Sequence, residues 1–132
     1  MNPSEQRFLV ADDYPDLRRL AVMALADLGY TQVETAVDGQ EALEKLRAGR
    51  YDFVLTDLRM PRLDGFGLLR AIKADPALKH LPVIIMSAND PSQFADPSER
   101  LGAAGYLTKP VMGPALQKAI QKALTDRGRA SG

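Results

Sequence analysis

The sequence predicts a single α/β domain in which helices cover both faces of a five-stranded, doubly wound parallel sheet. Two observations lead to this fold class. Short apolar runs of strand length alternate with segments whose apolar residues recur at helical spacing, as in successive βα units. The length of 132 residues and the apolar content of 45% suffice for one core and call for no second domain.

Local signals support each predicted element. Pro15 suits the first turn of a helix, and Gly29 offers a cap at its end. Asp38 and Glu41 have the spacing of a capping box, and Pro76 ends the third helix. The strands are expected at 8–11, 32–36, 53–56, 83–86 and 106–108, and the helices at 15–29, 38–49, 66–75 and through 116–124.

The fourth helix and the first helix carry more specific expectations. Pro91 and Pro97 interrupt the segment where the fourth helix would run, so we expect a late start at Asp96 or a short irregular segment. The first helix shows an apolar stripe that should face the core: Leu17, Leu20, Ala21, Ala24, Leu25 and Leu28.

Polar side chains stand directly after four of the predicted strands. Asp12 and Asp13 follow the first strand, Asp57 the third, Ser87 the fourth and Lys109 the fifth. The carboxyl ends of parallel strands meet at one edge of a sheet, so these side chains are expected to lie together. Each alone has an ordinary structural role, as a helix cap, a turn residue or a solvated cation. Only their joint position argues for a site.

Three acids in one place repel one another unless a cation offsets their charge. Oxygen ligands without histidine or cysteine favour a hard ion, so Mg²⁺ is the expected cofactor, with Mn²⁺ as a substitute. A divalent ion, an ammonium group and a hydroxyl group around Asp57 also suit phosphoryl transfer, in which the carboxylate is the nucleophile.

Four segments resemble, in order and spacing, the receiver domain of two-component response regulators, the CheY-like family: "VADD", "LTDLRMPRLDG", "PVIIMSA" and "GYLTKP". The resemblance covers about residues 7–124 and implies a flavodoxin-like (βα)₅ fold with strand order 2-1-3-4-5. We accordingly expect an N-terminal tail at 1–6, a receiver domain at 7–125 and a frayed C-terminal tail at 126–132.

The resemblance implies how a phosphoryl group would arrive. Asp57 would accept it from a phosphohistidine on a sensor histidine kinase or a histidine phosphotransfer protein. The magnesium would be held by Asp13 and Asp57, by Asp12 through water, and by the main-chain carbonyl of Arg59. His80 is the only histidine and reads as an ordinary surface residue, so the phosphohistidine must belong to another protein.

The resemblance also implies a switch. Lys109 would pair with the phosphoryl group, and the Lys109–Pro110 bond would be cis. Ser87 would turn towards the phosphoryl group and Tyr106 would move inward, changing a protein-binding surface formed by the fourth helix, fifth strand and fifth helix. Arg59 and Asn89 flank the acceptor at positions that tune self-dephosphorylation in the family. No other enzymatic activity is expected.

Charge and composition limit the kinds of partner that the protein is expected to bind. Seventeen basic and seventeen acidic residues cancel, which argues against direct binding to nucleic acid or a membrane. The chain has no cysteine and a polar start, and we expect a cytoplasmic protein. On the first helix, a small apolar patch beside two cations offers a docking face for the kinase or phosphotransfer partner: Arg18, Arg19, Val22, Met23 and Ala26.

Two other functions stay open at this stage. One is a receiver-like module that binds partners without phosphorylation. The other is a magnesium-dependent phosphatase that acts on a small molecule through an aspartyl phosphate. The phosphatase would need an acid or base two residues after the nucleophile, where this chain has Arg59, and a substrate-holding insertion, so it is the weaker alternative.

Overall fold

The five strands form one parallel sheet in the order β2-β1-β3-β4-β5, which confirms the predicted fold class. The computed structural model describes residues 2–88 and 102–131 of the chain. The strands are β1 Arg7–Ala11, β2 Gln32–Ala36, β3 Phe53–Asp57, β4 Val83–Ser87 and β5 Gly105–Thr108.

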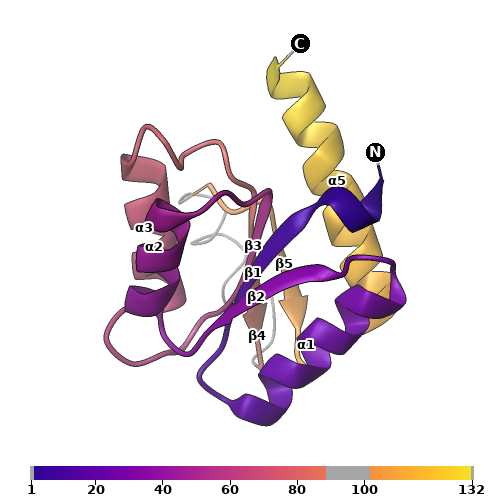
Figure 1. Cartoon of the computed structure of the whole chain (residues 1–132), viewed down its shortest axis with the longest axis horizontal. Helices are drawn as coiled ribbons and strands as arrows, with labels where there is room; N and C mark the ends of the chain where they lie inside the picture. The colour runs from indigo at the N-terminus through magenta and orange to yellow at the C-terminus, as the bar shows by residue number, and fades with distance from the viewer. Residues whose placement is uncertain (1, 89–101, 132) are drawn as a thin grey trace.

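Helices cover both faces of the sheet, with α2 and α3 on one face and α1 and α5 on the other (Figure 1). Asp38 and Asp64 cap α2 and α3 by accepting main-chain N–H groups of the first turn. The helices are α1 Pro15–Asp27, α2 Gly39–Ala48, α3 Gly65–Ala74 and α5 Gly113–Ser131, and a short 3₁₀ helix, η1, spans Pro3–Glu5. The predicted fourth helix falls in 89–101, outside the described residues.

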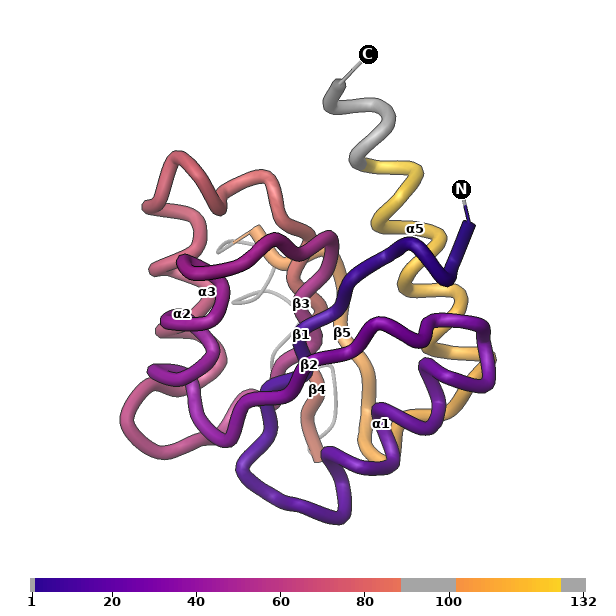
Figure 2. The backbone as a smooth tube through the Cα atoms, viewed as in Figure 1, coloured from indigo at the N-terminus to yellow at the C-terminus, as the bar shows by residue number. Residues whose placement is uncertain are grey.

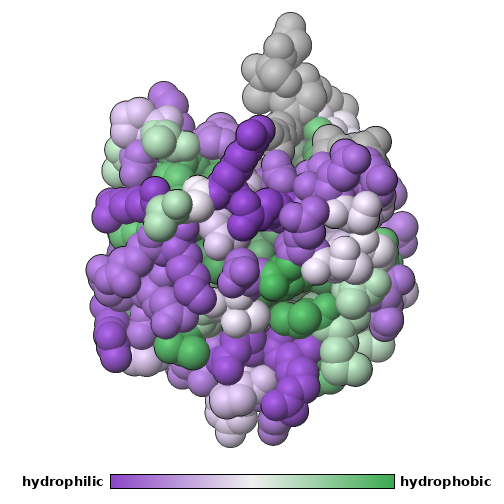
Figure 3. All heavy atoms as spheres, viewed as in Figure 1, coloured by the Kyte–Doolittle hydropathy of each residue, from purple (hydrophilic) through white to green (hydrophobic). Residues whose placement is uncertain are grey.

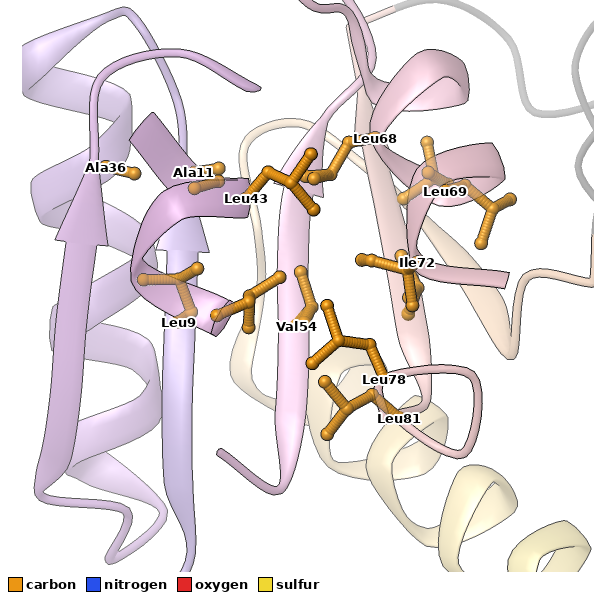
Figure 4. Close-up of a cluster of buried hydrophobic side chains, with 14 of the residues drawn as sticks. Leu9, Ala11, Ala36, Leu43, Val54, Leu68, Leu69, Ile72, Leu78 and Leu81 are labelled. Carbon is orange, nitrogen blue, oxygen red and sulfur yellow. The ribbon is translucent and has the colours of Figure 1, made fainter. Parts of the chain in front are cut away.

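A hydrophobic core fills each side of the sheet. Figure 4 shows Leu9 and Val54 of the sheet beside Leu43 of α2 and Leu68 and Ile72 of α3, all buried. On the other face the core is built by Phe8, Phe53, Leu25, Leu116 and Ile120, among others. Every residue of β3 and β4 is buried, as expected for central strands with helices on both faces. The site at the strand ends therefore stands on a rigid base.

One expectation from the sequence is wrong. Leu20 is 45% exposed, because Ala21 and Leu25 mark the buried face of α1 and each residue turns by about 100° from the last. α5 continues to Ser131, and the fraying expected for 126–132 stays a prediction. This stretch contains no proline, and a glycine inside a helix costs only about 1 kcal/mol. The division of the chain at 7–125 stays a prediction.

The surface is mostly hydrophilic on the side that carries β2. Figure 3 shows small separate hydrophobic areas there, between β2 and α1, and no broad apolar face in that view. Within the described parts of the chain, every helix is too short or too polar to cross a membrane.

Candidate functional site

The polar residues that follow the strands meet at the carboxyl edge of the sheet. Asp12 follows β1 directly, and its N–H donates to the carbonyl of Ala36 at 3.0 Å. Asp57 and Ser87 are the last residues of β3 and β4, one residue further than the strands were predicted to run. Lys109 follows β5, and its N–H donates to the Ser87 carbonyl at 2.8 Å. Sheet hydrogen bonds thus fix the main chain at each of these positions.

A buried lysine joins two of the carboxylates. The Nζ of Lys109 lies 2.7 Å from Oδ2 of Asp12 and 3.2 Å from Oδ1 of Asp57. The side chains of Lys109 and Asp12 are 7% and 0% exposed, so both contacts are charge-assisted hydrogen bonds in a poorly solvated place. Asp12 also accepts the N–H of Tyr14 at 2.9 Å.

Asp13 adds a third carboxylate from the solvent side. One carboxylate oxygen from each of Asp12, Asp13 and Asp57 lies within 4.8 Å of the others. Asp13 is exposed while the other two acids are buried. One ammonium group cannot offset three carboxylates, and an all-oxygen donor set open to water suits a hard divalent ion such as Mg²⁺.

The environment of Asp57 opposes its negative charge. Burial raises the pKa of Asp57 above its ordinary value, and the nearby Asp12 carboxylate raises it further, whereas the Lys109 ammonium lowers it. The net direction is upward. The ionised Asp57 would therefore be stabilised by an added cation, and a perturbed carboxyl group in a cleft is a candidate for chemistry.

An open cleft of about 400 Å³ gives access to the acids. Asp13, Asp57 and Lys109 line it, together with Ser87, which is only 9% exposed. The sequence predicts every acid of the site but not three other residues that line the cleft, Tyr14, Leu17 and Ala88. The further lining residues are Tyr14, Leu17, Arg59 and Ala88. The position of Tyr14 two residues after a strand-end aspartate, where an aspartate side chain often accepts a main-chain N–H, was the available signal.

Tyr106 lies away from this cleft. It belongs to β5, where it is in register with Ile85, and it packs half-buried against the hydrophobic cluster on the α2 and α3 side. The Lys109–Pro110 peptide bond is cis. His80 is exposed in the loop before β4 and does not line the cleft. Asn89 falls outside the described residues.

The start of α3 is packed tightly against the end of β3. The N–H of Gly65 donates to the carbonyl of Leu58 at 2.8 Å, and a Cβ atom at Gly65 would lie 2.5 Å from the carbonyl oxygen of Asp57. Only glycine fits this contact without movement of the backbone. The close approach fixes the main chain of Asp57 against the helix that follows it.

The family model described as the response regulator receiver domain matches residues 8–121. The chain is a receiver domain. It is 39% identical over 116 residues to the chemotaxis protein CheY of Pseudomonas aeruginosa, a match that covers 88% of this chain and 94% of the relative. It is 37% identical over 116 residues to CheY-3 of Vibrio cholerae, covering 88% and 89%. Receiver domains are signalling modules of two-component systems.

Solved structures of receiver domains have the same fold. CheY4 of Vibrio cholerae matches with a TM-score of 0.80 at 32% identity, over 89% of this chain and 98% of that one. The response regulator TrrA of Thermotoga maritima matches with a TM-score of 0.78, also at 32% identity and with the same coverage. The TrrA structure is a complex with Mg²⁺-BeF. A relative of this fold therefore binds the ion that the acid cluster of this receiver domain suits.

Proposed function

We propose that this receiver domain accepts a phosphoryl group on Asp57 from a phosphohistidine of a histidine kinase or a histidine phosphotransfer protein, in a Mg²⁺-dependent reaction. The observation that carries the proposal is the position of Asp57: it stands in an open cleft with two more carboxylates and the Lys109 ammonium group. Family membership supports the same conclusion. In this role the protein is a phosphoacceptor whose only reactions are transfer of the phosphoryl group to its own Asp57 and hydrolysis of the resulting aspartyl phosphate.

The transfer step uses the Asp57 carboxylate as the nucleophile. A carboxylate oxygen of Asp57 attacks phosphorus as the phosphorus–nitrogen bond to the imidazole breaks, and the electron pair of that bond stays on the imidazole nitrogen. The product is an acyl phosphate on Asp57. Lys109 would pair with a phosphoryl oxygen, since its ammonium group already lies within hydrogen-bonding distance of Asp57.

The residues around Asp57 fit a magnesium ion. Asp13 and Asp57 would bind it directly, Asp12 would bind it through water, and the main-chain carbonyl of Arg59, a residue that lines the cleft, would complete the protein ligands. When bound, the ion would offset the charge of the acids and of the transferred phosphoryl group.

Ser87 and Tyr106 are the proposed switch. Ser87 lines the cleft, so its hydroxyl could turn towards a phosphoryl group on Asp57. Tyr106 is in register with Ile85, on the strand whose end is tied to Ser87 through the Lys109 N–H. A population shift then follows, because only one arrangement of Ser87 gains the new hydrogen bond.

The output surface would include β5 and α5. A hollow of about 350 Å³ lies between them, and its lining includes several alanines together with Lys118 and Lys122. An acidic protein segment with apolar side chains would complement it. The contribution expected from the fourth helix lies outside the described residues.

The exposed apolar side chains of α1 would receive the phosphohistidine partner. Met23 is 55% exposed and Leu20 45%, and Tyr14 at the helix start is 62% exposed beside the acceptor cleft. Val22 is half-buried, so the docking face differs from the one expected from the sequence. Arg19 is exposed on the same helix and adds positive charge.

Intact mass spectrometry tests the proposal. The receiver domain is incubated with acetyl phosphate and Mg²⁺, and again with a chelator in place of the metal. The expected result is one phosphoryl adduct that needs Mg²⁺ and is lost in Asp57→Asn. Asp52→Asn is a matched control, because Asp52 is a half-buried carboxylate that accepts a main-chain N–H at the other end of the same strand. An adduct in Asp57→Asn at the wild-type level would overturn the proposal.

A further inference from the structure

The loop between β3 and α3 contains a turn that needs support from elsewhere in the chain. Arg62 has a φ of 69°, in the left-handed region that favours glycine. The N–H of Leu63 donates to the carbonyl of Pro61 at 2.8 Å, so Arg62 is the central residue of a γ-turn with positive φ. Such turns are rare and strained, and strained backbone persists only where its surroundings hold it.

An ion pair with α2 is the first support. The Nε of Arg62 lies 3.4 Å from Oδ2 of Asp38. The other carboxylate oxygen of Asp38 accepts the N–H of Glu41 at 2.7 Å and caps α2. The Asp38 side chain is only 4% exposed, whereas Arg62 is 74% exposed. A carboxylate this buried needs compensation, while the exposed arginine end keeps the pair's contribution to global stability small.

A close main-chain contact is the second support. A Cβ atom at Gly39, the first residue of α2, would lie 2.1 Å from the carbonyl oxygen of Leu63. The start of α2 therefore rests directly on the turn, and the two loops run side by side at the lower left of Figure 2. Asp64, the next residue, accepts the N–H of Gly67 at 2.7 Å and caps α3.

We propose that Arg62 is a positioning residue for the acceptor site: its ion pair with Asp38 holds the 58–64 loop so that the Arg59 main-chain carbonyl is presented to a divalent cation at the acid cluster. This inference rests on the proposed function, in which that carbonyl is a metal ligand. Arg59 lines the acceptor cleft, and only Met60 and Pro61 separate it from Arg62. Without the ion pair, the strained turn relaxes, and the Arg59 carbonyl is held less firmly in the position at which it would bind the cation.

Four variants separate the ion pair from other effects. Arg62→Ala removes the pair, and Arg62→Lys keeps a cation at the same place. Asp38→Asn removes the buried charge but keeps an oxygen that caps α2. Arg47→Ala is the matched control, because it removes an arginine–carboxylate pair of the same kind, Arg47 Nε to Asp75 Oδ2 at 3.5 Å, at the opposite ends of α2 and α3.

Two measurements decide the proposal. The Mg²⁺ dissociation constant, from a titration followed by amide NMR shifts, is expected to rise about three- to tenfold in Arg62→Ala and Asp38→Asn and to stay within about twofold in Arg62→Lys and Arg47→Ala. In metal-free protein, amide hydrogen exchange at Leu63 and Gly65 is expected to accelerate in the first two variants only, because those N–H groups close the turn and the loop.

Each failure has a distinct meaning. Unchanged exchange in Arg62→Ala would overturn the claim that the pair holds the loop. Faster exchange with an unchanged Mg²⁺ affinity would overturn the link between the loop and the metal site. If the wild-type domain bound no Mg²⁺ at all, the proposed metal site would fail and the metal half of this inference with it, while the exchange rates would still decide whether Arg62 and Asp38 order the loop.

Discussion

The ammonium group of Lys109 lies 3.2 Å from Oδ1 of Asp57 and forms a second contact, of 2.7 Å, with Asp12. Lys109 is the one residue among those described that forms an ion pair with the acids of the cleft. It joins the end of β5 to the ends of β1 and β3, which are not its neighbours in the sheet. A single side chain thus fixes the spacing of the strand ends at which the chemistry is proposed to occur.

Replacing Lys109 by methionine should destabilise the metal-free protein by roughly 2–4 kcal/mol, since removal of one partner leaves buried carboxylates without compensation. Added Mg²⁺ should restore part of the loss, because the ion offsets the same charges. Urea denaturation with and without Mg²⁺ measures both effects. Lys118→Met, at an exposed position on α5, is the control and should change stability little. Equal losses in the two variants would contradict the assigned role of Lys109.

Asp57→Asn should stabilise the metal-free protein at neutral pH. Burial raises the pKa of Asp57, so ionisation of this group costs folding free energy, and the cost appears as the pH rises from the ordinary aspartate pKa of about 3.9 through the raised folded value. The gain in Tm should therefore vanish at acidic pH, below the ordinary value, and be largest near pH 7. Thermal melts across this pH range test it, and a gain that is independent of pH would show that the charge is not its cause.

Gly65→Ala should destabilise the domain by about 1–3 kcal/mol, because the added methyl group would lie 2.5 Å from the Asp57 carbonyl oxygen and would force the end of β3 away from α3. Gly113→Ala is the control. Gly113 also begins a helix, but a Cβ atom there meets nothing within 4 Å, so this variant should be neutral or slightly stabilising. Chemical denaturation of both variants provides the comparison, and two equal free energies of unfolding would refute the packing argument.

Leu20→Glu combined with Met23→Glu should slow phosphotransfer from a phosphohistidine protein that phosphorylates the wild type, and should leave the rate with acetyl phosphate unchanged. Both side chains are exposed on α1, so folding should tolerate the change. Val37→Glu, at a position that is 45% exposed, as Leu20 is, but after β2, serves as the control. If both donors slowed equally, the substitutions would have damaged the acceptor site rather than a docking face.

The sequence was sufficient to predict the sheet and the convergence of the acids. Strand and helix periods are local, and parallel strands necessarily bring the residues after their ends to one edge. It could not tell which aspartate is buried. Asp12 and Asp13 are adjacent, and successive residues leaving a strand point in opposite directions, so burial depends on how the strand meets its neighbours.

The contact between Asp38 and Arg62 was likewise beyond sequence reasoning. The spacing of Asp38 and Glu41 predicts a helix cap, which Asp38 is, but no pattern in the sequence singles out Arg62. Their pairing depends on two loops from separate βα units lying side by side, and the positive φ of Arg62 has no signal in a residue type that rarely adopts it. The exposure of Leu20 could not be predicted either, because helical spacing alone does not fix the width of the buried face of a helix.

The most direct test of the central claim, that Asp57 is the phosphoacceptor, locates the modified residue chemically. The domain is phosphorylated with acetyl phosphate and Mg²⁺, reduced with borohydride, which converts an aspartyl phosphate to homoserine, digested and sequenced by tandem mass spectrometry. Homoserine at position 57 alone is the predicted result. Homoserine at position 12 or 13, or no conversion at any position, would contradict it, and the last outcome would favour a receiver domain that binds its partners without phosphorylation.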